Sequence, residues 1–336
     1  MKAYEIQQFG IENLALIERD EPKPQATEVL VKFHAASLNY RDLMTVKGTY
    51  NPKLKLPLVP LSDGAGEVVA VGEQVSKWTV GDRVCPIFMQ GWTDGAIDFQ
   101  KARTTLGGDF DGCLREFGTF NENGLVKIPD NLSFEEAATL PCAAVTAYHA
   151  LFTSGCLKAD DTVLLQGTGG VSVFALQFAS VHGCRTIITS SDNEKLNRAK
   201  DLGADELINY REREDWDKAV LELTEKQGVE QICEVGGAGT MQKSLNSVKM
   251  GGHIAVIGVL AGKGDFDLRS ILMKSVKMQG IFVGSRQMFE RMNQMICQHT
   301  HFKPVVDKVF EFEAAREAFK YMESAAHFGK IVIKIN

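Results

Sequence analysis

The order of apolar and polar positions changes character near residue 129. Before it, short β-type runs such as residues 28–38 and 64–72 are separated by turns rich in Gly and Pro. After it, short apolar runs alternate with helical stretches. The six runs occupy residues 162–166, 185–191, 206–210, 231–235, 253–259 and 278–284. The pattern predicts a partly antiparallel β-domain followed by a doubly wound parallel sheet with helices on both faces, an α/β fold class.

The same pattern divides the chain into three parts, residues 1–128, 129–285 and 286–336. Near the start of the second part, Ser133 is followed three residues later by Glu136, the spacing of a capping box that opens a helix. The third part contains two more helical stretches and a final strand, which would let the chain return to the first domain.

Composition restricts the function more than the fold. The chain has 336 residues, 44% of them hydrophobic and 24% charged, which indicates a globular protein of about two domains. A net charge of −6 without runs of Lys or Arg argues against nucleic acid or an anionic membrane as partner. No apolar stretch approaches the roughly 18 residues of a membrane-spanning helix, and we expect a cytoplasmic protein. Seven scattered cysteines predict reduced, mostly buried thiols and no closed zinc site.

A glycine-rich loop follows the strand at 162–166. Its sequence, GTGGVS, places Gly167, Gly169 and Ser172 at the three positions of G-x-G-x-x-G, with Gly170 and Val171 between them. The third glycine only permits close packing of helix on strand, and the Ser172 hydroxyl can bond back to a helix carbonyl. The strand-loop-helix context predicts a site for a dinucleotide pyrophosphate; the alternative is a strand-to-helix turn without a ligand.

The end of the next strand indicates which dinucleotide. An NAD site usually carries an acid there, whereas this strand ends in Ser190 and Ser191, with Lys195 close behind. Hydroxyls and an ammonium group suit a 2′-phosphate, and NADPH is therefore the expected cofactor. Asp192 either caps the following helix or contacts a ribose.

Six segments occur in a characteristic order: NYRD, GAGEVVAVGEQVSKWTVGDRV, GTGGV, LGAD, INYRE and GKIVIKI. With them, almost the whole chain resembles the medium-chain dehydrogenase/reductase superfamily, and most of all its zinc-independent quinone oxidoreductase branch. The resemblance implies a GroES-like catalytic domain made from 1–128 and 286–336, with a Rossmann NADP(H)-binding domain, 129–285, inserted between them.

The resemblance also bears on zinc. Asn39 stands where the zinc alcohol dehydrogenases of the superfamily carry a Cys ligand, and Ser62 and Asp63 stand at their His-Glu positions. Cys142 alone matches a ligand position. Since a catalytic zinc needs three protein ligands, we expect neither a catalytic nor a structural metal site, and Cys142 as a small buried residue.

Further residues are assigned through the same resemblance. Asn39 and Tyr50 correspond to substrate-pocket positions, while Met44 departs from a Tyr found there. Ser191, Lys195 and Tyr210 match positions that grip the adenosine 2′-phosphate. Positions around the nicotinamide and its ribose are matched by Thr146, Val235, Gly258, Val259, Phe282 and Val283, although ordinary core packing is an alternative for the aliphatic ones. Asp42, Asp63 and Glu116 are expected to brace loops, with Arg41 as partner of one of them.

These features favour NADPH-dependent transfer of hydride to a quinone or an α,β-unsaturated carbonyl. The alternatives are an alcohol dehydrogenase, an enoyl-thioester reductase, or a non-catalytic NADPH-binding protein. Residues 88–117 form a long Gly/Asp-rich loop that either covers the pocket or is disordered. An apolar edge at residues 276–284 predicts a homodimer, unless a helix or the C-terminal segment covers it.

Overall fold

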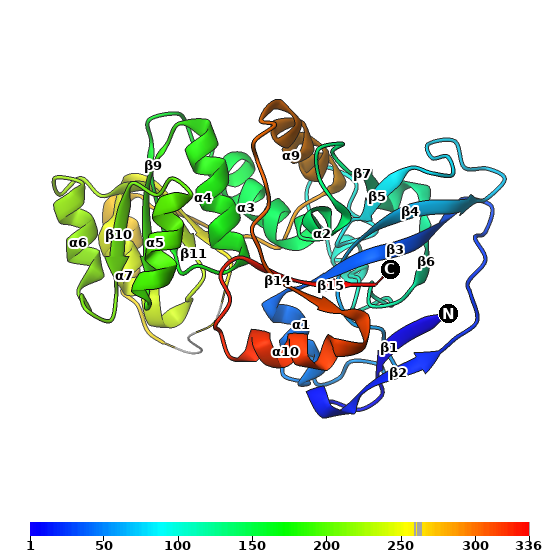
Figure 1. Ribbon diagram of the computed structural model, residues 1–336. Coiled ribbons are helices and arrows are strands. Elements are labelled where there is room, and N and C mark those ends of the chain that lie inside the picture. Colours follow the sequence, from blue (N-terminus) through cyan, green and yellow to red (C-terminus); the bar gives the residue numbers. More distant parts are fainter. Residues whose placement is uncertain (259, 261–263, 336) are drawn as a thin grey trace. The chain divides into compact units, whose positions relative to one another are not determined.

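The computed structural model describes residues 1–258, 260 and 264–335, and it divides into two compact units (Figure 1). Unit 1 comprises Met1–Val145 and Gly284–Asn336, and unit 2 comprises Thr146–Val283. The chain passes from unit 1 to unit 2 after residue 145, which is 17 residues later than the predicted boundary after residue 128. Residues 129–145 stay with unit 1 because Arg83 holds them: its Nη2 donates to the Leu132 carbonyl (2.6 Å) and its guanidinium stacks on the Phe134 ring.

Unit 2 is built on a sheet of six parallel strands in the order β10-β9-β8-β11-β12-β13. Every predicted strand is present. All except β8 end earlier than the predicted apolar run, and β11, β12 and β13 also begin earlier. The strands are β8 (Thr162–Gln166), β9 (Arg185–Ser190), β10 (Glu206–Asn209), β11 (Val229–Glu234), β12 (Val248–Val256) and β13 (Lys277–Gly280). From β8 the chain first adds β9 and β10 on one side, and then adds β11, β12 and β13 on the other side. This change of side leaves a crevice at the carboxyl ends of β8 and β11.

Helices connect these strands, as parallel pairing requires. One core cluster joins Leu164, Ile187 and Ile254 of the sheet to Val220 of α6 and Leu245 of α7. The helices are α4 (Gly170–His182), α5 (Asn193–Asp201), α6 (Trp216–Leu223), α7 (Ala238–Ser247) and α8 (Leu268–Lys274). Helices α4 and α5 pack instead on β8, β9 and β10.

Unit 1 contains a mainly antiparallel sheet in the order β14-β15-β3-β4-β5-β7, with β6 also paired to β3, and a separate hairpin β1-β2. Its strands are β1 (Lys2–Ile6), β2 (Leu14–Glu18), β3 (Glu28–Leu38), β4 (Asp63–Val71), β5 (Arg83–Pro86), β6 (Phe117–Asn121), β7 (Leu125–Lys127), β14 (Val306–Glu311) and β15 (Lys330–Lys334). Its α-helices include α1 (Tyr40–Val46), α2 (Phe134–Ala137), α9 (Arg286–Gln298) and α10 (Ala315–Glu323). The C-terminal strand β15 pairs with β3, so both ends of the chain build one GroES-like sheet.

This antiparallel pairing brings three segment ends together. Strand β3 ends at Leu38, opposite Ile331 of β15, and Ser37 lies opposite Asp63 of β4. The residue after β3, Asn39, therefore lies beside the first residues of β4 and β15. These are Asp63 and Lys330, which are 267 positions apart in the chain.

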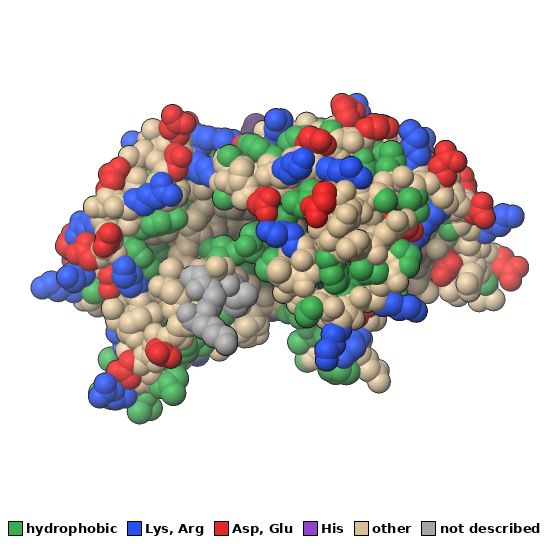
Figure 2. Space-filling model, turned by 90° about the horizontal axis from the view of Figure 1, so that it is seen from below, with side chains coloured by type: hydrophobic (Ala, Val, Ile, Leu, Met, Phe, Trp, Pro, Cys, Tyr) green, Lys and Arg blue, Asp and Glu red, His purple; other side chains and the backbone are tan. Residues whose placement is uncertain are grey.

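The start of α2, the cysteines, the helix lengths and the surface charges each bear on a prediction from the sequence. The capping box of Ser133 and Glu136 is present at the start of α2. All seven cysteines are free, and five of them are buried. No helix within the described ranges is long and apolar enough to cross a membrane. On the face shown in Figure 2, basic and acidic side chains are interspersed.

The long loop at 88–117 is ordered and anchored at its base. Trp92 and Leu106 are buried, and the Trp92 carbonyl accepts from the Arg286 N–H at the start of α9 (3.0 Å). Its tip is exposed, with Phe99 stacked against Arg103. The alternative of a disordered loop is therefore wrong; a covering role stays a prediction.

Candidate active site

In unit 1, a polar cluster surrounds Asn39, which precedes α1. The buried Lys330 donates from Nζ to the Asn39 side-chain oxygen Oδ1 (2.6 Å) and to the Leu38 carbonyl (2.7 Å). The Asn39 amide nitrogen Nδ2 lies 3.5 Å from Ser62 Oγ. Because its oxygen accepts from Lys330 and one N–H donates to Ser62, Asn39 offers its second N–H, and not its oxygen, to a ligand from outside the cluster.

Asp63 ties this cluster to the rest of unit 1. Its carboxylate is fully buried and accepts from the hydroxyl of Ser62 (2.8 Å) and from the backbone N–H of Cys142 (3.4 Å). Lys330 Nζ is 3.6 Å from Asp63 Oδ2. Asp63 therefore braces a loop, as expected, and also balances a buried ammonium group.

Arg41 belongs to α1 and lies beside Tyr50, which follows the helix. Arg41 donates to Asp42 Oδ1 (3.0 Å) and to the Leu106 carbonyl, and its guanidinium lies 5.3 Å from each of the Tyr50 and Phe88 ring centres. Burial raises the pKa of Asp42, the Arg41 charge lowers it, and the Asp63 charge raises it. Tyr50 is 45% exposed, and its backbone N–H donates to the Met44 carbonyl (3.2 Å). Arg41 is the partner of Asp42, and Tyr50 is held beside Arg41.

In unit 2, the glycine loop connects β8 to α4. Gly167 has φ +70°, a conformation that favours glycine. Gly169 does not, and a Cβ added at either position would meet no atom of the chain within 4 Å. Neither the backbone conformation nor packing against the described residues requires a glycine at 169, and the open space leaves room for a ligand. The loop fits a pyrophosphate at the N-terminus of α4.

Ser172 replaces the third glycine without opening the helix-strand contact. It is buried, and its hydroxyl donates to the carbonyl of Gln166, the last residue of β8 (2.6 Å). The acceptor is therefore a strand carbonyl, and the expected bond to a helix carbonyl was wrong. The bond fastens the first turn of α4 directly to β8.

The residues predicted to surround a 2′-phosphate lie at the ends of β9 and β10. The Tyr210 N–H donates to the Ser190 carbonyl (3.0 Å), so these two strand ends are adjacent. Asp192 caps α5, accepting from the N–H groups of Glu194 and Lys195, which shows the capping role that was one of its two alternatives. Ser190 is buried and its hydroxyl accepts from the Asp192 N–H (3.3 Å), whereas Ser191, Lys195 and Tyr210 reach the surface.

The other cofactor candidates lie at or near the carboxyl ends of β11, β12 and β13, apart from Thr146, which is buried at the start of unit 2. Val259 lies outside the described residues. Gly258 follows β12, and a Cβ there would come 2.1 Å from the Val235 carbonyl oxygen. Close approach of two loops explains this glycine. The buried Glu234 carboxylate fixes the loop after β11 by accepting from the N–H groups of Gly236 and Gly237.

Strand β13 ends earlier than the apolar run 278–284 indicated. Val283 has φ +56°, which is strained for a β-branched residue and turns the chain out of the sheet. His149 holds this turn by donating from Nδ1 to the Val283 carbonyl (2.7 Å). The strain and its support lie next to Phe282, another predicted cofactor contact.

Two buried histidines predict a pH-dependent stability. Desolvation lowers the pKa of His149 and also that of His253, whose neighbours Lys277 and His149 lower it further. Unfolded chains then bind more protons below about pH 6.5 than folded ones. The contribution of these two histidines to the free energy of unfolding should be fully present above that pH. It should be lost as the pH is lowered toward 5.

Urea unfolding between pH 5 and 8 checks this expectation. His149→Gln and His253→Gln should each flatten the acid decline, while the exposed control His299→Gln should not. Equal slopes in all four proteins would mean that other groups cause the decline.

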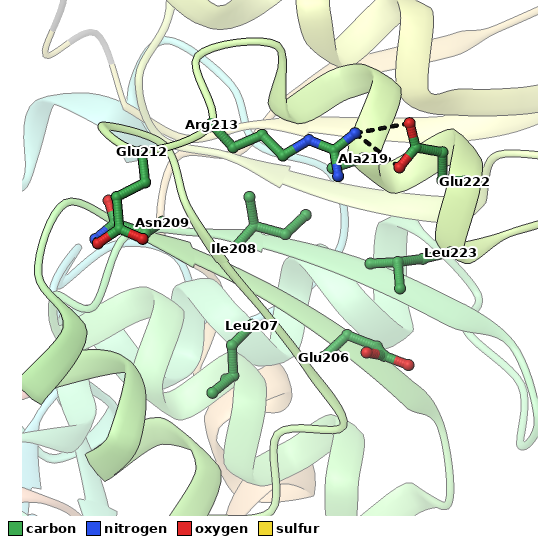
Figure 3. A pocket seen from close by; sticks show the side chains of 9 residues that line it. All are labelled: Glu206, Leu207, Ile208, Asn209, Glu212, Arg213, Ala219, Glu222 and Leu223. Atoms are coloured by element: carbon green, nitrogen blue, oxygen red, sulfur yellow. Dashed lines mark hydrogen bonds and ion pairs between the residues drawn. The ribbon is translucent and has the colours of Figure 1, made fainter.

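A separate cavity of about 540 Å³ lies along the outer strand β10 (Figure 3). Its charged groups pair with one another: Arg213 Nη2 donates to both oxygens of Glu222 (2.7 Å each), and Asn209 donates to Glu212 (3.1 Å). It contains neither the glycine loop nor the Asn39 cluster, and its polar side chains are satisfied. The candidate functional residues are therefore those of the glycine loop and of the Asn39 cluster.

Comparison with known proteins identifies the family. Residues 170–298 match the zinc-binding dehydrogenase family, and residues 25–130 match the alcohol dehydrogenase GroES-like domain. A zinc-type alcohol dehydrogenase-like protein of Schizosaccharomyces pombe is 44% identical over 335 residues, covering 97% of this chain and 96% of that protein. The chain belongs to the medium-chain dehydrogenase/reductase superfamily.

Two further members show the breadth of this superfamily around the chain. The quinone oxidoreductase of Sus scrofa is 28% identical over 342 residues, with 99% of this chain and 97% of that protein covered. The crystal structure of an NAD-dependent alcohol dehydrogenase has a TM-score of 0.90 and 32% identity, with both chains fully covered. As a superfamily member, the chain is an oxidoreductase.

The residues at the zinc position of the superfamily do not fit the metal. Only Cys142 could supply a soft ligand, and burial together with the Asp63 charge raises the pKa of its thiol far above the usual range, whereas zinc binds a thiolate. Asp63 already accepts hydrogen bonds, and the Lys330 ammonium lies 3.6 Å from it. No group of three His, Cys, Asp or Glu side chains suited to a metal comes together in the described part of the chain.

Lys330 was not among the predicted site residues, because its role depends on pairing between distant strands. The signal that could have found it is the GKIVIKI segment, in which a lysine occupies the first position of an otherwise apolar strand. Lysine is almost never fully buried unless it is paired, so an apolar strand with a lysine at its start invites a search for its partner.

Proposed function

We propose that this superfamily member is a zinc-independent, NADPH-dependent reductase of a quinone or an α,β-unsaturated carbonyl. The observation that carries the proposal is the Asn39 amide, whose oxygen accepts from Lys330 and whose nitrogen donates one N–H to Ser62, which leaves the second N–H as a donor. Such a donor is suited to a carbonyl oxygen that gains negative charge.

Bound NADPH supplies the hydride. The chain's own residues then have three tasks. The glycine loop holds the pyrophosphate, Ser191, Lys195 and Tyr210 bind the 2′-phosphate, and the Asn39 N–H groups orient the substrate carbonyl. A preorganised donor of this kind is worth roughly 3 to 4 kcal/mol in a dry site. That contribution suits reduction of an activated carbon, whereas oxidation of a plain alcohol normally relies on zinc to lower the pKa of the hydroxyl.

An alcohol dehydrogenase is the second candidate, because two of the similar proteins carry that name. The purified protein, dialysed against a strong chelator and analysed for zinc, should be assayed with NADPH and a panel of quinones and enones, and with NADP⁺ and alcohols. We expect turnover only in the first panel, at well below one zinc per chain. Activity confined to alcohols, or lost with the metal, would contradict the proposal, and cofactor binding without any turnover would indicate a binding protein.

Lys195 tests the choice of cofactor. Lys195→Ala should weaken NADPH binding by about 10- to 150-fold, because a charge-assisted bond to phosphate is worth roughly 1.5 to 3 kcal/mol. NADH binding should change little. Lys200→Ala, an exposed lysine at the other end of α5, is the control. Equal affinity of the parent protein for NADPH and NADH would remove the preference for NADPH.

The free edge of unit 2 supports a homodimer, and the reduced cysteines support a cytoplasmic location. Strand β13 is the last strand of its sheet, and its neighbour α8 presents Leu268, Leu272 and Met273 to the surface. The Ile281 N–H donates toward β12, so those of Met278 and Gly280 point away from the sheet. A second copy would cover this edge about a two-fold axis.

Sedimentation of Leu272→Glu tests the dimer. Leu272 is 77% exposed, so the charge should cost the subunit little and weaken association at least tenfold. Phe99→Glu, an equally exposed apolar residue in unit 1, should leave association unchanged. A parent protein that sediments at 37.0 kDa at micromolar concentration would exclude the dimer.

A further inference from the structure

Lys330 is the most deeply buried lysine near the candidate active site, and its surroundings assign it a task. Its residue is 2% exposed, and Nζ has three neighbours: the Leu38 carbonyl at 2.7 Å, Asn39 Oδ1 at 2.6 Å and Asp63 Oδ2 at 3.6 Å. An ammonium group has three N–H donors. Two of the donors are hydrogen-bonded, to Leu38 and Asn39, and the charge is balanced by the Asp63 carboxylate as an ion pair.

The side-chain amide of asparagine can be turned by 180° with little change in shape, which exchanges its oxygen and nitrogen. Here only one orientation is compatible with Lys330, because the ammonium group cannot accept a hydrogen bond from an amide N–H. The oxygen must face Lys330, and the nitrogen must face Ser62 and the outside of the cluster. A charged donor on the amide oxygen also polarises the amide and strengthens its N–H groups as donors.

Asn39 has a second, separate anchor. Its backbone N–H donates to Asp42 Oδ2 (2.9 Å), and its side chain faces the Asp42 backbone N–H, so the two residues form a capping box at the start of α1. Asp63 in turn holds Lys330 in place from β4. Asp42 therefore fixes the backbone of Asn39, while Lys330 adds a charged donor on the amide oxygen to the contact that the capping box makes with the side chain.

We propose that Lys330 is a positioning residue, which acts on the substrate carbonyl only through Asn39 by keeping the amide N–H groups turned outward. This inference rests on the proposed function for its kinetic consequence, although the contact itself can be tested without turnover. Lys330→Met should lower kcat about 10- to 100-fold and leave the Kd of NADPH unchanged.

The decisive measurement is the effect of Asn39→Ala in two backgrounds. In the parent protein it should lower kcat about 100-fold, but in Lys330→Met it should lower kcat further by less than about threefold, because residues that act as one unit are not additive. The surface variant Lys47→Met, whose lysine pairs with Glu323, should leave the 100-fold effect intact. Additive losses, or an unchanged kcat in Lys330→Met, would overturn the proposal.

Removing Lys330 alone leaves Asp63 as an unpaired buried carboxylate, which can prevent folding. Asp63→Asn combined with Lys330→Met removes both charges, and Asn39→Ala should again have less than about a threefold effect in that background. A full 100-fold effect there would overturn the proposal.

A spectroscopic readout separates this inference from the proposed function. In protein labelled with ¹⁵N-asparagine, the side-chain NH₂ signal missing from Asn39→Ala identifies Asn39. That signal should shift in Lys330→Met and stay in place in Lys47→Met, and an unshifted signal would overturn the proposal. If no quinone or enone is reduced by the parent protein, the proposed function fails, whereas the NMR result still decides whether Lys330 orients the amide.

Discussion

Asn39→Ala should lower the turnover of NADPH-dependent carbonyl reduction by about 100-fold and leave NADPH affinity nearly unchanged. The amide donates one N–H to Ser62 Oγ (3.5 Å) and its oxygen accepts from Lys330, which leaves its second N–H for a substrate oxygen. Removal of one donor of an oxyanion-type site typically costs 10² to 10³ in kcat, about 2.7 to 4 kcal/mol. Steady-state kinetics with a reactive enone, together with NADPH titration, measures both quantities.

The matched control is Asn51→Ala, an exposed asparagine in the same unit whose side chain accepts from the Lys53 N–H. It should retain parent kinetics. If Asn39→Ala also keeps the parent kcat, Asn39 is a structural residue, and another group must stabilise the developing charge.

A loss confined to KM would lead to a different conclusion. It would mean that Asn39 binds the ground state and the transition state equally, so that its amide contributes affinity and not rate. The two results are distinguished by measuring kcat and KM separately. The Asn39→Ala variant keeps the backbone bond to Asp42 and loses only the side-chain half of the capping box.

The local parts of this structure could be predicted from the sequence because their causes lie within a few residues. Six apolar runs separated by helical stretches indicated the parallel sheet, and the spacing of Ser133 and Glu136 indicated the start of α2. The glycine loop could be recognised despite Ser172, because the third motif position tolerates a small side chain that can hydrogen-bond to β8. These are consequences of periodicity, capping and steric space.

Other features depend on distant partners and were not visible in the sequence. Lysine is normally read as a surface residue, and only the pairing of β15 with β3 reveals that Lys330 meets Asn39. The early end of β13 depends on the backbone of Val283, which a β-branched residue adopts only when its surroundings impose it. The boundary after Val145 depends on Arg83, which lies 49 positions before Leu132 and holds that segment to unit 1.

Gly169→Val should abolish tight binding of the dinucleotide while the protein stays folded. At a closely packed glycine such as Gly258, an added Cβ would collide with the protein, here with the Val235 carbonyl. At Gly169 the added group meets no protein atom within 4 Å, and the residue has the extended backbone that valine accepts. The valine side chain would instead fill the space in front of the α4 N-terminus, where the pyrophosphate must approach the backbone.

The expected result is a loss of NADPH affinity of about 100-fold, in line with the upper range of roughly 3 kcal/mol for inserting side-chain atoms into a filled space. The free energy of unfolding without cofactor should fall by no more than about 1 kcal/mol, since valine is a poorer N-cap than glycine. Titration of NADPH fluorescence and urea unfolding measure the two effects, and Gly169→Ala should give an intermediate loss. Parent affinity in both variants would show that the loop holds no pyrophosphate, whereas a large loss of stability would show that glycine at 169 serves the fold.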